Sequence, residues 1–135
     1  MKYLVDTSAL TRIVRRQVEP EWHDIAGRGL ITICEPALAE TLVTADAKKY
    51  AALEADLRDT YPFAAVPDNI WNLVAVIRRE LALHSAHQGL SVADLVIAAT
   101  AIRLKLTVLH EDADFETVGR HVSELRQRRV SAGPE

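Results

Sequence analysis

The chain has 135 residues, a length typical of one domain, with 49% hydrophobic and 26% charged residues, as in ordinary globular proteins. Its net charge of −3 provides no overall positive field, which counts mildly against bulk electrostatic binding of RNA or DNA. The single cysteine, Cys34, excludes an internal disulfide framework and fits a reducing cytoplasm.

Short apolar runs alternate with helical patterns in the first half of the chain. Asp6 interrupts the first apolar run, so no signal peptide is expected. Thr7 or Ser8 can cap the helix that follows. In chain order, the expected elements are a strand at 3–5, a helix to about Gln17, a short helix at 22–28, a strand at 30–34, a helix from Pro36 and a helix at 47–58.

The second half continues the alternation. The helix at 92–105 is apolar nearly all round, which predicts a central and buried position. Its longest apolar stretch, 95–102, is too short to span a bilayer. In chain order, the expected elements are a strand at 61–66, a helix from Pro67 to Gly89, the helix at 92–105, a strand at 107–109, a short helix at 114–119 and a last edge strand at 122–125.

This order of elements predicts the fold class. Strands that alternate with helices form an α/β domain with a mostly parallel sheet, here of about five strands, and helices on both faces. Residues 1–130 are expected to form this one domain, and residues 131–135 a disordered tail.

Acidic residues stand beside the expected strand ends and helix starts. Asp6 ends the first strand, Asp94 opens the buried helix, and Asp112 and Asp114 follow the fourth strand; Glu40 lies in the helix after the second strand. The working site of an open parallel sheet lies beyond the carboxyl ends of its strands. Carboxylates that converge there repel one another unless a cation holds them, and hard oxygen ligands favour Mg²⁺ or Mn²⁺. The pattern therefore indicates metal-assisted phosphodiester cleavage.

Each acid also has an ordinary structural interpretation. Asp6 can be a helix N-cap, and Asp94 has the capping-box position three residues after a serine. Glu40 can be a solvated helix residue, and Asp112 and Asp114 suit a turn and helix start. The metal hypothesis depends on all five lying on one predicted rim.

The same residues carry a resemblance to a known family. In order along the chain, Leu4-Val-Asp-Thr-Ser-Ala-Leu10, Glu40, Asp94-Leu-Val-Ile-Ala-Ala99 and Asp112-Ala-Asp-Phe115 resemble a PIN domain, and within that group the VapC toxins of bacterial VapBC toxin–antitoxin pairs. The resemblance covers nearly the whole chain. It identifies residues 1–130 as a PIN-like nuclease domain.

The resemblance implies a three-layer α/β/α sandwich with a five-stranded parallel sheet. It implies a Mg²⁺- or Mn²⁺-dependent endoribonuclease that dimerises, and a VapB-type antitoxin whose C-terminal tail occupies the active-site groove. Asp6, Glu40, Asp94 and Asp112 match the acidic ligands, with Glu40 either on the metal or one shell out, and Asp114 matches a frequent fifth acid. The matched hydroxyls are those of Thr7 and Ser8, with Thr7 preferred.

Two positions depart from the family pattern. His110 stands where the family often carries threonine, which puts contacts inferred at that place in doubt. The block before Glu40 is loose, and Glu35 remains a reserve candidate five residues earlier. On a helix, Glu35 would face away from Glu40.

The expected mechanism is attack on phosphorus by a metal-bound water that a carboxylate helps to deprotonate. It would leave 5′-phosphate and 3′-hydroxyl ends. Arg12, Arg15 and Arg16 share a helix face by spacing and would grip RNA phosphates or an acidic antitoxin segment, or form a solvated surface.

The sequence argues against two other functions. An aspartyl phosphotransferase needs a second Asp where Ser8 stands, and a Rossmann protein needs a glycine-rich loop after the first strand. A catalytically silent module that binds RNA or antitoxin stays open as an alternative. Deoxyribonuclease activity also stays open, because nothing in the sequence reads a 2′-hydroxyl.

Overall fold

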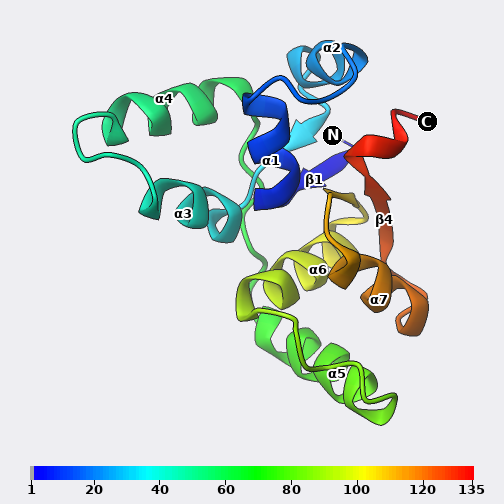
Figure 1. Ribbon diagram of the computed structural model, residues 1–135. Helices are drawn as coiled ribbons and strands as arrows, with labels where there is room; N and C mark the ends of the chain where they lie inside the picture. The colour runs from blue at the N-terminus through cyan, green and yellow to red at the C-terminus, as the bar shows by residue number, and fades with distance from the viewer. Residues whose placement is uncertain (1) are drawn as a thin grey trace.

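The computed structural model describes residues 2–135 and contains one parallel sheet of four strands, in the order β2-β1-β3-β4 (Figure 1). Met1, the first residue of the expected domain, lies outside the described residues. The strands are β1 (Tyr3–Val5), β2 (Ile31–Thr32), β3 (Thr107–His110) and β4 (Arg126–Arg129). The parallel sheet and the alternation with helices confirm the predicted α/β class.

Helices connect and cover the strands. They are α1 (Thr7–Val14), α2 (Glu21–Gly27), α3 (Glu35–Val43), α4 (Tyr50–Thr60), α5 (Ile70–Leu83), α6 (Val92–Leu104), α7 (Ala113–His121) and the 3-10 helix η1 (Val130–Ala132). In Figure 1, α3 and α4 extend to the left of the sheet, and α5 lies below it. No helix within residues 2–135 is long and apolar enough to cross a membrane.

The core forms around the two central strands. All residues of β1 are buried, and α6, which packs on β3, is buried at Ile97, Ala98 and Ala99 as its all-round apolar sequence predicts. Trp22 of α2 is also fully buried, and its indole N–H donates to the carbonyl of Val130 at 2.9 Å. This bond ties the C-terminal segment to the core.

The sheet has four strands rather than five. The segment expected as a strand at 61–66 makes only an isolated parallel bridge, between Ile33 and Phe63. Pro62 accepts from the N–H of Ile33 but has no N–H of its own to extend the ladder. The segment therefore touches the edge of the sheet without joining it.

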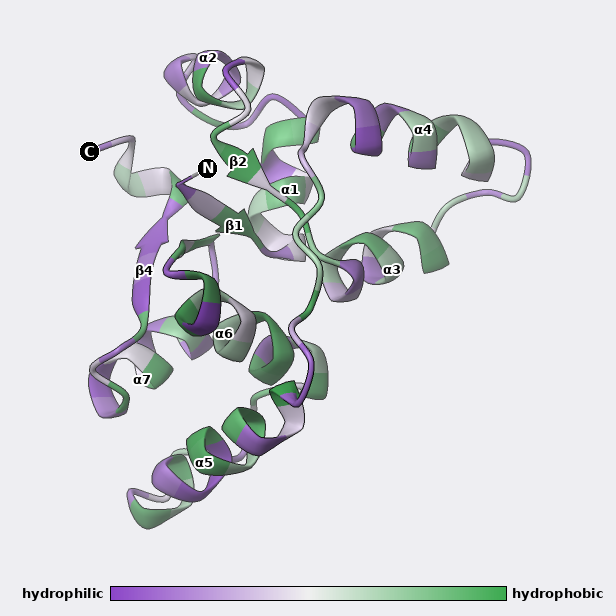
Figure 2. Ribbon diagram, turned by 180° about the vertical axis from the view of Figure 1, so that it is seen from behind, coloured by the Kyte–Doolittle hydropathy of each residue, from purple (hydrophilic) through white to green (hydrophobic). Residues whose placement is uncertain are grey.

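The last strand lies at 126–129 rather than 122–125. Val122 and Leu125 are taken up by turns, because their N–H groups donate to Val118 and Val122 respectively. The strand itself is Arg-Gln-Arg-Arg and is hydrophilic along its length (Figure 2). Its pairing with β3, not its composition, makes it a strand.

The expected disordered tail starts as ordered structure. Ser131 and Ala132 belong to η1, because the N–H and the hydroxyl of Ser131 both donate to the Glu111 carboxylate, at 3.0 and 2.9 Å. The expectation is corrected for these two residues.

Candidate active site

Three carboxylates meet where α6 and α7 begin. One oxygen each from Asp94, Asp112 and Asp114 lie within 4.8 Å of one another. Ser91 caps α6 by accepting the N–H of Asp94 at 3.1 Å, and Asp112 caps α7 by accepting the N–H of Asp114 at 2.9 Å. The helix caps and the convergence of acids are therefore the same feature, and each predicted structural role coexists with the predicted cluster.

Asp6 stands beside these three without belonging to the closest group. Its side chain is 3% exposed and caps α1, accepting the N–H of Ala9 at 2.9 Å and the Ser8 hydroxyl at 2.8 Å. Its own N–H donates to the carbonyl of Leu109 at 3.0 Å, which fixes the end of β1 against the end of β3. Parallel pairing thus brings Asp6 to the edge from which Asp112 follows.

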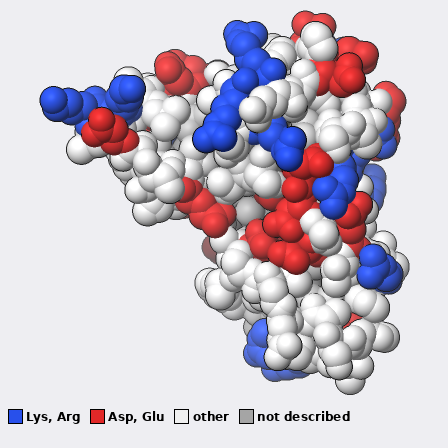
Figure 3. Space-filling model, in the orientation of Figure 1, with Lys and Arg blue, Asp and Glu red and all other residues white. Residues whose placement is uncertain are grey.

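Burial makes the acids reluctant to ionise. It raises the pKa of Asp6 to about 6 and that of Asp94 to about 6, and the charge of Asp112 adds to both effects. The pKa of Asp114 is raised by burial and then by Asp112. In Figure 3, acidic side chains gather in the recessed middle of this face, between the part that carries α3 and α4 and the part that carries α5. A cation at this place would offset the free-energy cost of burying these negative charges and would reduce their mutual repulsion.

Glu40 reaches the site from α3 through a hydroxyl. It is exposed, and its Oε1 accepts the hydroxyl of Thr7 at 2.8 Å. Thr7 directly follows Asp6, so this bond holds Glu40 against the start of α1. Glu35, the reserve candidate, is exposed at the first residue of α3.

The Ser8 hydroxyl bridges two segments. It donates to the Asp6 carboxylate and accepts the N–H of Glu111 at 2.9 Å. The family pattern favoured Thr7 over Ser8, but both hydroxyls are used, Thr7 toward Glu40 and Ser8 between Asp6 and the loop after β3. Ser8 therefore holds the two halves of the acidic site together.

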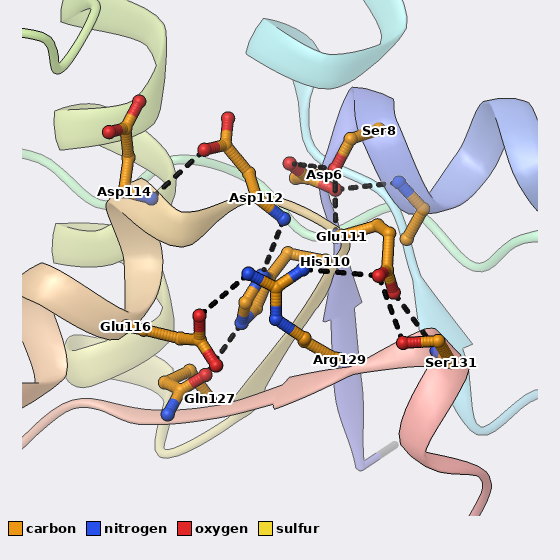
Figure 4. A network of polar contacts seen from close by, with 11 residues as sticks. Asp6, Ser8, His110, Glu111, Asp112, Asp114, Glu116, Gln127, Arg129 and Ser131 are labelled. Atoms are coloured by element: carbon orange, nitrogen blue, oxygen red, sulfur yellow. Dashed lines mark hydrogen bonds and ion pairs between the residues drawn. The ribbon is translucent and has the colours of Figure 1, made fainter.

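His110 lies beneath the acidic loop and is fully buried. Its Nδ1 accepts the N–H of Asp112 at 3.0 Å, and its Nε2 lies 2.6 Å from the amide oxygen of Gln127 in β4 (Figure 4). Burial lowers the pKa of His110, so the ring is neutral at neutral pH. The sequence singled out this position only as a departure from the family, and no short-range signal pairs it with Gln127.

Arg129 forms a second connection between β4 and the same loop. Its guanidinium donates to Glu111 at 3.1 Å and to Glu116 at 2.7 Å. Although burial alone would raise it, hydrogen bonds from Ser131 and Arg129 hold the pKa of Glu111 below its usual value. The hydrogen bond from Arg129 also lowers the pKa of Glu116. Arg129 is therefore a structural residue that joins β4 to the segment after β3.

Basic residues lie over α1, next to the acidic recess (Figure 3). Arg12 and Arg15 are exposed, and neither takes part in an ion pair within residues 2–135. Arg16 does not share their helix face as predicted, because α1 ends at Val14 and Arg16 has a left-handed backbone with φ 55°. Of the three predicted arginines, Arg12 and Arg15 therefore remain candidates for one exposed basic surface.

Comparison with known proteins identifies relatives over most of the chain. The family model described as PIN domain matches residues 3–121. Ribonuclease VapC6 of Mycobacterium tuberculosis is 37% identical over 106 residues, which cover 78% of this chain and 84% of that protein. Ribonuclease VapC21 of the same organism is 31% identical over 122 residues, which cover 87% and 86%.

Solved structures share the fold at low sequence identity. The DNA-bound VapBC structure from Salmonella typhimurium superposes with a TM-score of 0.77 at 18% identity, covering 96% of this chain and 98% of that one. FitAcB from Neisseria gonorrhoeae superposes with a TM-score of 0.71 at 21% identity, covering 95% and 97%.

Proposed function

Because the chain belongs to the PIN domain family, we propose that it is a Mg²⁺- or Mn²⁺-dependent endoribonuclease that acts as the toxin of a toxin–antitoxin pair. Relatives named ribonuclease VapC, at 37% and 31% identity, support the reaction class. The observation that carries the proposal is the convergence of the Asp94, Asp112 and Asp114 oxygens within 4.8 Å, with buried Asp6 beside them.

The residues present suit a hard divalent cation. Every donor at the convergence is a carboxylate oxygen, the ligand type that Mg²⁺ and Mn²⁺ prefer, and sulfur or imidazole donors are not among the three. Burial raises the pKa of Asp6, Asp94 and Asp114, so a bound cation would offset the cost of ionising these carboxylates. Asp94, Asp112 and Asp114 would hold the ion, with Asp6 beside them and Glu40 further out.

Such an ion, when bound, supplies an activated water and stabilises the leaving oxygen of a phosphodiester. The chain's own part is to place the ligands and to take up the proton of the attacking water on a carboxylate. Ser8 and Thr7 keep Asp6 and Glu40 in place for this, through the bonds described above. The products would carry 5′-phosphate and 3′-hydroxyl ends.

A polyanionic substrate must approach an acidic recess, so positive side chains nearby matter. Arg12 and Arg15, on and after α1, are exposed and would bind RNA phosphates or an acidic antitoxin segment. A VapB-type antitoxin is the proposed partner, since solved structures of the same fold are VapBC complexes. Exposed apolar side chains, among them Val43 at 75% and Trp71 at 61%, offer surface for antitoxin or homodimer contacts.

The decisive experiment compares wild type, Asp94→Asn and Asp24→Asn after induction in bacteria, with growth followed and RNA 5′ ends mapped. Asp94→Asn keeps the shape of the helix cap but removes a proposed ligand, and Asp24 is an exposed acid of α2 that serves as the matched control. We expect arrest and new 5′-phosphate ends with wild type and Asp24→Asn. With Asp94→Asn, cleavage by purified protein should fall about a thousandfold, the scale of several kcal/mol of lost metal-ion assistance.

Equal arrest by all three proteins would contradict a carboxylate-dependent nuclease and would favour a binding module. Cleavage by the purified protein in EDTA at the wild-type rate would contradict the metal.

A further inference from the structure

His110 is a buried polar side chain with a partner at each ring nitrogen. The N–H of Asp112 points at Nδ1 at 3.0 Å, and Gln127 Oε1 lies 2.6 Å from Nε2. A backbone N–H can only donate, so Nδ1 accepts, and the proton of the neutral ring sits on Nε2. Nε2–H then donates to Gln127. The hydrogen bonds run in one direction, from Asp112 through His110 to β4 (Figure 4).

Packing fixes both ends of this chain of hydrogen bonds. Gln127 crosses α7 at Gly119, where an added Cβ would lie only 3.3 Å from Gln127 Cγ, so a glycine there gives the glutamine its path. The His110 ring packs on Phe115 of α7, with 5.3 Å between ring centroids. Both side chains therefore pack against α7.

Asp112 is thereby held on two sides. Its N–H is bound by His110, and its Oδ1 accepts the N–H of Asp114. Both the backbone and the side chain of Asp112 are oriented, and its carboxylate is aimed at the place where Asp94 and Asp114 converge.

We propose that His110 and Gln127 are positioning residues, which use the edge strand β4 to set the direction of the Asp112 carboxylate for cation binding. The proposal rests on the proposed metal-dependent function. Groups one step from a metal ligand typically change metal affinity about 10–100-fold when they are removed.

The test is Mn²⁺ binding to the purified full chain, measured by calorimetry. Gln127→Met has the same length without an acceptor, whereas Gln127→Glu keeps an acceptor oxygen. Arg126→Met, at an exposed position of the same strand, is the matched control. We expect Gln127→Met and His110→Phe to bind Mn²⁺ about 10-fold more weakly. Gln127→Glu and Arg126→Met should bind as wild type does.

The outcomes separate this inference from the proposed function. If wild type does not bind Mn²⁺, or if Asp112→Asn binds it as wild type does, the proposed metal site itself fails. If Asp112→Asn loses binding while Gln127→Met and His110→Phe keep wild-type affinity, only the positioning role is overturned.

A measurement on the unmutated chain needs no variant to fold. Nitrogen-15 NMR of the imidazole of His110 should show the proton on Nε2. A proton on Nδ1 would overturn the hydrogen-bond chain, and thus the inference.

Discussion

Asp6 and Asp112 follow neighbouring parallel strands, but different parts of the chain hold them. The bonds to the Asp6 carboxylate come from Ser8 and Ala9, within three residues of it. Asp112 is held through His110 by Gln127, and the residue before it is held by Arg129 and Ser131. One side of the site is thus a local turn, while the other depends on a strand that arrives near the end of the chain. Substitutions in β4 should therefore leave Asp6 in place but should disturb Asp112.

On the local side, Asp6→Asn should have the largest effect on stability, because Asp6 is more buried than Asp112. In the unfolded chain its pKa is near the ordinary value of 3.8, and in the folded chain it is about 6. The folded state therefore binds more protons between these values. The contribution of Asp6 to stability is fully present below about pH 3.8 and is lost as the pH rises to about 6. Two pH units correspond to at most about 3 kcal/mol.

Without divalent metal, Asp6→Asn should therefore be more stable than wild type at pH 7, by up to about 3 kcal/mol. The two proteins should converge at pH 3.5. Urea unfolding at both pH values measures this. Glu111 and Glu116 titrate in the opposite sense, but they are common to both proteins and cancel in the difference. If the wild type is the more stable protein at pH 7, the pKa of Asp6 is not raised in the folded chain.

Arg129→Met tests the dependence on β4. Loss of the guanidinium leaves Glu111, whose side chain is 10% exposed, with only its Ser131 bonds. We expect the free energy of unfolding to fall, because the variant removes the ionic partner of the Glu111 carboxylate. Arg126→Met, on an exposed position of the same strand, should change stability by less than about 0.5 kcal/mol. An equal effect of both variants in chemical denaturation would refute the structural role of Arg129.

The difference between the two sides also explains what the sequence could predict. Asp94 can be placed at a helix start because Ser91 stands only three residues before it, and the hydroxyl of Ser8 is matched to Asp6 through the family motif that contains both. Gln127 and Arg129 act through strand pairing, which short-range patterns do not encode, and Arg-Gln-Arg-Arg has no strand-like alternation. Because strand pairing is not visible in short-range patterns, the last strand was predicted four residues too early and residues 61–66 were predicted to be a strand. The α/β class was predictable because long apolar helices and short apolar runs do alternate.

Ser8→Ala removes the hydroxyl that joins the two sides. The N–H of Glu111 would lose its acceptor and Asp6 would lose a donor, both in a partly buried place. We expect a loss of about 1 kcal/mol in stability, as for one hydrogen-bonded network member. The variant should also weaken Mn²⁺ binding in calorimetry, because Asp6 and the loop before Asp112 are no longer tied. Unchanged stability and unchanged Mn²⁺ affinity would show that the two sides are held independently.

Thr7→Val should have the smallest effect on stability, although its hydroxyl is only one residue away from that of Ser8. The bond it makes to Glu40 is exposed, so water replaces it, and the free energy of unfolding should change by no more than about 0.5 kcal/mol. If Glu40 acts in catalysis, RNA cleavage should nevertheless fall by about the same factor in Thr7→Ala and Thr7→Val, since both release Glu40. Thr7→Ser keeps the hydroxyl and should cleave as wild type does. Full activity in all three variants would remove Thr7 from the site and leave Asp6 with the Ser8 hydroxyl alone.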